Sequence, residues 1–107
     1  MKGFNGGMAQ LMKQANQMQL KMKKTQEEVG KQEFTGTSGG GAVNVVVTGD
    51  NKVMSVKIKP DVFKAGDAEM LEEMIVSATN DAIKLAKDTM AKEMEKITGG
   101  MGIPGMF

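Results

Sequence analysis

The chain has 107 residues, no cysteine and no histidine, and its 14 basic residues are all lysine. A chain of this length forms one small domain, with little room for an enzyme cleft beside its own core. Without cysteine it can form neither a disulfide nor a zinc–thiolate site, and no run of about 20 apolar residues is present to cross a membrane. We expect a soluble cytoplasmic protein that needs no metal, organic cofactor or small-molecule substrate.

The net charge of +1 is unevenly distributed along the chain. Residues 1–24 contain five lysines and no acidic residue, whereas residues 65–107 carry a net charge of −4. Lysine offers a point charge to phosphate but lacks the planar fork with which arginine recognises a guanine edge. Any nucleic-acid binding should therefore depend on the phosphate backbone more than on the bases.

Residues 8–29 are predicted to form a long amphipathic helix that stops at Gly30, after a glycine-broken, frayed segment at residues 1–7. Lys13 and Lys24 point away from its apolar side, and Lys21 and Lys23 flank that side. Apolar or small residues recur in alternating three- and four-residue steps and form one narrow stripe: Met8, Leu11, Ala15, Met18, Met22, Thr25 and Val29.

Three antiparallel strands are predicted at residues 32–35, 42–48 and 52–59, joined by a glycine-rich loop and a short turn. Apolar residues alternate with polar ones in the second and third strands, as in a sheet with one buried face. Val62 and Phe63, just after the third strand, are expected to tuck under the sheet. The inward-facing residues of the two longer strands are predicted to be Val43, Val45, Val47, Met54, Val56 and Ile58.

A second long helix is predicted from about Ala68 to about Ile97, with Asp67 as its N-cap. Residues 99–107 form a glycine- and methionine-rich tail without regular structure. The fold class is therefore α+β, with one α-β-β-β-α domain at residues 8–98. The apolar stripe of the second helix consists of Leu71, Ile75, Ala78, Ala82, Leu85 and Thr89.

Element lengths indicate how this domain assembles. A helix of roughly 30 Å is longer than a strand of about 17–20 Å, so part of each helix must extend past the sheet. A second copy is the simplest partner for the uncovered stripe, and we expect a homodimer with projecting helical arms, with Val46 and Val53 also at the interface. The alternative is a helical hairpin over one sheet face. The predicted dimer or arm contacts are Leu11, Ala15, Met18, Met22, Leu71, Ile75, Ala78, Ala82 and Leu85.

Several short motifs resemble one known family. They include Ser38-Gly39-Gly40-Gly41 before the alternating valines, Lys57-Ile58-Lys59-Pro60, Glu69-Met70-Leu71-Glu72-Glu73, Asn80-Asp81-Ala82 and Thr98-Gly99-Gly100-Met101. Over nearly its whole length the chain resembles the YbaB/EbfC family of bacterial nucleoid-associated proteins. The resemblance implies an α-β-β-β-α protomer, a tweezer-like dimer with protruding helical arms, and binding to double-stranded DNA. The complete absence of arginine departs from many members.

With this resemblance, the lysines of the first helix become the leading DNA-contact candidates, although a solvated helix face would show the same pattern. Lys84 and Lys87 point away from the second stripe but share their region with acidic residues. The candidate DNA-binding residues are Lys13, Lys21, Lys23, Lys24, Lys84 and Lys87.

Other function classes have less support. No set of side chains suits general-base or nucleophilic catalysis, so we expect a protein that is not an enzyme. The 12 methionines lie along helix stripes and in the tail, which favours flexible packing over copper binding. The main alternative is a protein-interaction or chaperone-like dimer that uses methionine-lined arms, and a weaker one is a basic helix lying on anionic lipid.

Overall fold

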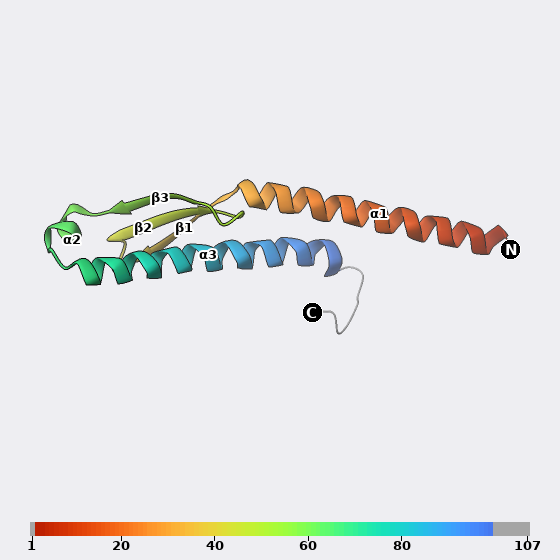
Figure 1. The fold of residues 1–107 in the computed structure, drawn as a ribbon. Coiled ribbons are helices and arrows are strands. Elements are labelled where there is room, and N and C mark those ends of the chain that lie inside the picture. The colour runs from red at the N-terminus through yellow and green to blue at the C-terminus, as the bar shows by residue number, and fades with distance from the viewer. Residues whose placement is uncertain (1, 100–107) are drawn as a thin grey trace.

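The computed structural model describes the backbone of residues 2–99 and the side chains of residues 7–99. Its elements are α1 (Lys2–Lys31), β1 (Glu33–Ser38), β2 (Val43–Thr48), β3 (Val53–Ile58), α2 (Pro60–Lys64) and α3 (Ala68–Thr98). The α-β-β-β-α order is confirmed, with α2 added between the sheet and the last helix. The molecule measures 77 × 25 × 16 Å. α3 forms one layer, while α1 and the sheet lie end to end in the other (Figure 1).

The core lies between α3 and two of the three strands. The sheet is antiparallel in the order β1-β2-β3, and α3 packs on β1 and β2. The alternate valines of β2 are fully buried, as predicted, beneath Ala78, Ala82 and Ala86 of α3. A Cβ atom on Gly36 of β1 would overlap the Ala78 carbonyl oxygen and lie 3.0 Å from the Ala82 Cα. The backbones of β1 and α3 are therefore in direct contact.

Hydrogen bonds fix the start of α3 and the outer edge of β1. Asp67 is the predicted N-cap, since its Oδ1 accepts a hydrogen bond from the Met70 backbone N–H at 3.0 Å. The Thr37 N–H donates to Asp81 Oδ2 at 3.1 Å, and the Ser38 hydroxyl donates to the Met74 carbonyl oxygen at 2.6 Å. α3 thus supplies acceptors to the edge of β1, which leaves β3 as the open edge of the sheet.

The direction of α1 is set where its last turn meets the β2–β3 turn. The Asp50 N–H donates to the Gly30 carbonyl oxygen, and the Gly49 N–H donates to the Gln32 carbonyl oxygen, both at 3.1 Å. A Cβ atom on Gly49 would overlap the Val29 carbonyl oxygen. Because these are backbone contacts, they hold α1 as an end-on extension of the sheet.

Some sequence predictions differ from the structure. α1 begins at Lys2 rather than near Met8, and it continues through Gly30 to Lys31. The prediction for Phe63 is wrong, because Pro60 opens helix α2 instead of only ending β3, and Phe63 on that helix is 70% exposed. A register irregularity also places Val53 opposite Val47. Val53 therefore shares the side of the sheet that faces α3, not the polar side, and the strict alternation predicted through Met54 is broken there.

The contact between β1 and α3 can be tested by Gly36→Val. The added side chain has no space between two backbones, so the free energy of unfolding should fall by about 3 kcal/mol or more. Gly7→Ala in α1 is the control, because a Cβ atom there meets nothing within 4 Å. It should leave stability unchanged or raise it by about 0.5–1 kcal/mol. Urea denaturation followed by circular dichroism measures both, and an unchanged midpoint for Gly36→Val would refute the contact.

Candidate nucleic-acid interface

The lysines of α1 lie on a helix that projects from the rest of the molecule. Lys13, Lys21, Lys23 and Lys24 are all exposed. Lys24 Nζ lies 4.0 Å from a Glu28 carboxylate oxygen, and the other three have no carboxylate within that distance among the described residues. Four ammonium groups on about three turns of one helix therefore face solvent, where a polyanion can reach them.

The opposite side of α1 packs on α3. Along the predicted stripe, Val29 is buried, the next three residues toward the N-terminus are half-buried, and the outermost three are exposed. Burial thus decreases steadily away from the sheet, because α3 runs beside only the C-terminal part of α1. Lys13 and Lys24 face away from α3, since they lie about 180° around the helix from the packed stripe.

The two layers of the protomer differ in charge. Residues 2–59, which form α1 and the sheet, contain nine lysines and four carboxylates, a net charge of +5. Residues 67–98, which form α3 and its cap, contain four lysines and eight carboxylates, a net charge of −4. The sheet face opposite α3 adds Lys57 to the cationic layer, with Asn44 paired beside it. A polyanion is therefore attracted to the α1 and sheet layer and repelled by the α3 layer.

Lys84 and Lys87 are exposed but lie on α3. They point away from the buried alanine stripe of that helix, and so away from the layer that carries Lys13 and Lys24. The structure does not bring the six candidate lysines onto one surface. The four α1 lysines form one group, and the two α3 lysines lie in an acidic setting on the other layer.

The predicted dimer or arm contacts also divide into two groups. Ala78 and Ala82 are fully buried inside the protomer, and Leu71 and Ile75 pack against the same core. Met18 and Met22 are half-buried where α1 meets α3. These six residues contribute to the fold of one protomer, and Ala78 and Ala82 have no exposed surface left for a partner. The predicted contacts that remain exposed are Leu11, Ala15 and Leu85.

An apolar surface that the sequence analysis missed runs along β3. Val56 lies opposite Val45 and shares its side of the sheet, yet Val56 is 42% exposed while Val45 is fully buried. Val53 and Met54 on the same strand are also exposed. The widths of the predicted helix and sheet could have revealed this surface. One helix of about 10 Å diameter covers about two strands spaced 4.8 Å apart, so the third strand stays uncovered.

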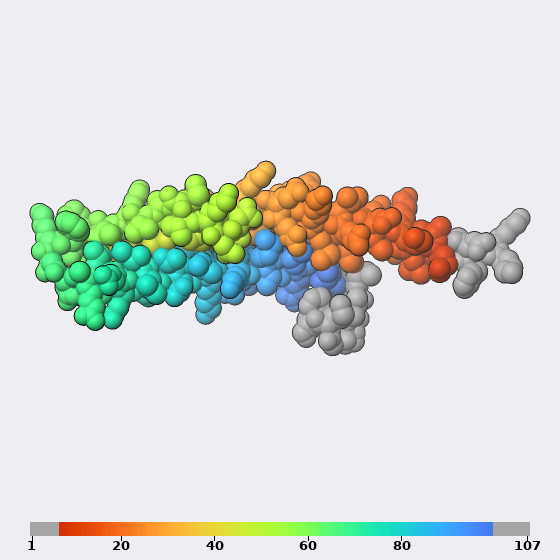
Figure 2. Space-filling model, in the orientation of Figure 1, coloured from red at the N-terminus to blue at the C-terminus, as the bar shows by residue number. Residues whose placement is uncertain are grey.

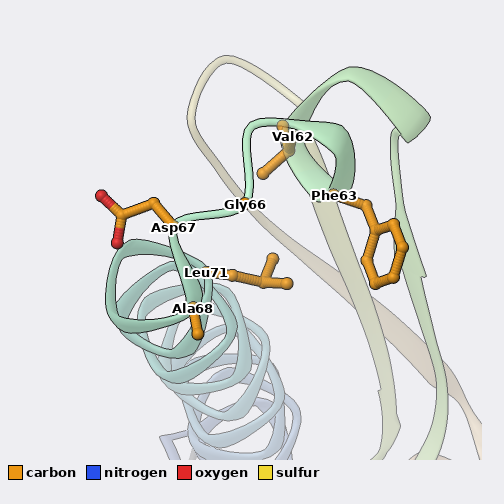
Figure 3. A pocket seen from close by; sticks show the side chains of 6 residues that line it. All are labelled: Val62, Phe63, Gly66, Asp67, Ala68 and Leu71. Carbon is orange, nitrogen blue, oxygen red and sulfur yellow. The ribbon is translucent and has the colours of Figure 1, made fainter.

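A small apolar hollow lies at the end of the molecule that carries α2. It measures about 220 Å³ and lies between α2 and the first turn of α3. Val62, Phe63 and Leu71 point toward it, while the Asp67 carboxylate points away (Figure 3). Asp67 is the one polar side chain among its lining residues. Among the described residues, no cluster of three or more histidine, cysteine, aspartate or glutamate side chains is arranged to hold a metal.

These features define a small α+β protein with one projecting cationic helix, a geometry suited to a polyanionic partner. Comparison with known proteins agrees. A model of the YbaB/EbfC DNA-binding family matches residues 4–101. The chain therefore belongs to the YbaB/EbfC DNA-binding family, and the resemblance seen in the sequence is confirmed.

Individual relatives match over almost the whole chain. A nucleoid-associated protein of Clostridium kluyveri is 49% identical over 105 residues, which cover 98% of this chain and 92% of that protein. A nucleoid-associated protein of Pelotomaculum thermopropionicum is 45% identical, and the match covers 97% of this chain and 99% of that protein. A crystal structure of an uncharacterized protein from Helicobacter pylori has a TM-score of 0.59 at 23% identity and covers 73% of this chain and 90% of that chain. That likeness shows the fold alone.

A helix that crosses a lipid bilayer requires about 20 predominantly apolar residues. None of the helices within residues 2–99 combines the necessary length with the necessary apolar character.

Proposed function

We propose that this protein binds double-stranded DNA as a homodimer, through contacts between the lysine ammonium groups of α1 and backbone phosphates. The observation that carries the proposal is the exposed, largely unpaired lysine group of α1, whose members Lys13 and Lys24 lie opposite the side that packs on α3. Membership in a DNA-binding family supports the choice of partner. The name of the relatives, nucleoid-associated protein, supports a place on the nucleoid. Organisation of the nucleoid and gene regulation in the cytoplasm are proposed as its roles. No catalytic step is part of this function.

Lysine contacts of this kind suit binding without strict sequence preference. An ammonium group attracts phosphate without recognising a base edge. The chain has no arginine, the residue whose planar fork could recognise a guanine edge. Lys57 on the outer sheet face is exposed and is placed to add a contact to the same DNA backbone. Lys84 and Lys87 are expected to contribute less, because α3 carries the negative layer.

The second copy is proposed to pack on β3. Three residues of this strand, Val53, Met54 and Val56, are apolar and exposed. β3 is also the sheet edge to which α3 supplies no acceptor comparable to Asp81 at the edge of β1. A second β3 would cover the apolar side chains and pair the open edge. This arrangement leaves both α1 arms projecting from the dimer.

A second candidate function has one specific observation in its favour. Met8 and Met12 are exposed on the projecting half of α1, and flexible methionine surfaces suit binding to varied protein segments. Copurification from cells separates the two functions. A complex that nuclease dissolves supports DNA binding, and one that resists nuclease and contains a protein supports the interaction module.

The location of the DNA contacts can be tested by two matched charge reversals. One double variant is Lys13→Glu with Lys24→Glu, and the other, Lys84→Glu with Lys87→Glu, changes the net charge by the same amount. All four side chains are exposed, so both variants should fold. The α1 pair should weaken DNA binding on the order of tenfold or more at low salt, measured by fluorescence anisotropy with a short duplex. The α3 pair should weaken it less. A larger loss for the α3 pair would place the DNA on the other layer.

The electrostatic mechanism predicts a steep dependence of binding on salt. If about six to eight lysines of a dimer reach phosphates, the slope of log affinity against log salt should lie between about −5 and −7. The slope should become shallower by about 0.9 for each lysine contact removed. Mobility-shift titrations from low to moderate salt measure it, and affinity that does not change with salt would exclude phosphate contacts as the main source of binding.

The β3 interface can be tested by Val56→Lys. A charge in the centre of a buried apolar contact is strongly unfavourable, so this variant should sediment as a monomer at concentrations where the parent protein is a dimer. Thr35→Lys, at an exposed position on the outer sheet face, is the control and should remain a dimer. Circular dichroism verifies that both are folded. A Val56→Lys dimer of unchanged stability would show that the copies associate elsewhere.

A further inference from the structure

The outer half of the apolar stripe on α1 has no partner within the described residues. α3 ends at Thr98, and its last apolar residue, Ile97, lies beside Met18 of α1. These two elements enclose a hollow of about 260 Å³, lined also by Gln14, Gln17 and Lys21. The stripe continues outward from this hollow for about two and a half further turns of α1.

The side chains on this outer part are unusually exposed for large apolar residues. Met8 is 51% exposed, and Leu11 and Met12 are each 64% exposed. Met8 and Leu11 continue the line of Met18 and Met22, which α3 covers, because they follow the same three- and four-residue steps. Figure 2 shows this part of α1, in red and orange, extending past the end of α3. An apolar strip that begins at a covered contact and then runs into solvent is a docking surface whose occupant must be identified.

The chain itself supplies a matching segment. Residues 100–107, which lie outside the described residues, have the sequence Gly-Met-Gly-Ile-Pro-Gly-Met-Phe, with four large apolar side chains and no charged one. They follow Gly99, which caps the C-terminal end of α3 two residues after Ile97. Eight extended residues span up to about 28 Å, whereas Met18 and Met8 are separated by about 15 Å along the axis of α1. The segment is long enough to reach the end of the stripe.

We propose that residues 100–107 pack along Met8, Leu11 and Ala15 of α1 in the same chain. The glycines and Pro104 disfavour continuation of α3 and suit an extended strand laid over a helix. The segment completes the apolar contact that α3 begins, while a second copy occupies the separate apolar surface at β3. Lys13 and Lys24 lie on the other side of α1, so the packed segment leaves the cationic face open to DNA.

Cysteine pairs test this proposal in the full-length protein, because the natural chain has no cysteine to interfere. Leu11→Cys with Ile103→Cys places one thiol on the stripe and one in the segment. Lys13→Cys with Ile103→Cys is the control, since position 13 lies about 160° around the helix from position 11. Both helix positions are exposed, so both proteins should fold. Air oxidation is followed by nonreducing electrophoresis and by mass spectrometry of the linked peptides.

The stripe pair should form an intramolecular disulfide at least tenfold faster than the control pair, and most of the product should run as a single chain. Equal rates for the two pairs would overturn the proposal, because the segment would then have no preferred side of α1. Covalent dimers as the main product would also overturn it, since a second copy would then cover the stripe. Neither result depends on DNA binding, so the test stands apart from the proposed function.

Discussion

The close contact between β1 and α3 is the constraint on which the rest of the structure depends. Gly36 and the small stripe that includes Ala78 and Ala82 allow backbone to approach backbone, and the buried valines of β2 then fill the remaining space. One helix seated this closely covers only the two strands beneath it. The exposure of β3 at Val56, and hence the surface proposed for a second copy, follows from where α3 lies.

The same arrangement separates the charges. α3 continues past the sheet and supports the C-terminal part of α1, while the backbone contacts around Gly49 direct α1 outward from the sheet end. The packed side of α1 faces the negative α3 layer, so its lysines face the other way. Attraction of a polyanion to one side and its repulsion from the other both follow from this packing. Positions far from the proposed DNA contacts, such as Gly49, therefore help to orient the lysines of α1.

Much of the fold could be predicted from local signals, but its layering could not. Alternation identified β2, and Asp67 marked the start of α3 because an N-cap is a local interaction. Periodicity identified the apolar stripe on each helix but not the surface that covers it. Ala82, for example, faces the sheet of its own protomer and not a second copy. Phe63 was misplaced because a proline that ends a strand can also begin a helix. For the candidate site, the sequence identified the exposed lysines, whereas their separation into two layers required the three-dimensional arrangement.

The proposed function places DNA against the cationic face of α1. Lysine acetylation with and without duplex DNA, read by mass spectrometry, tests it most directly, because lysine is the only basic residue type and occurs in both layers. DNA should reduce acetylation at Lys13 and Lys24 and leave Lys84 and Lys87 nearly unchanged. Protection of Lys84 and Lys87, with Lys13 and Lys24 still reactive, would contradict the account.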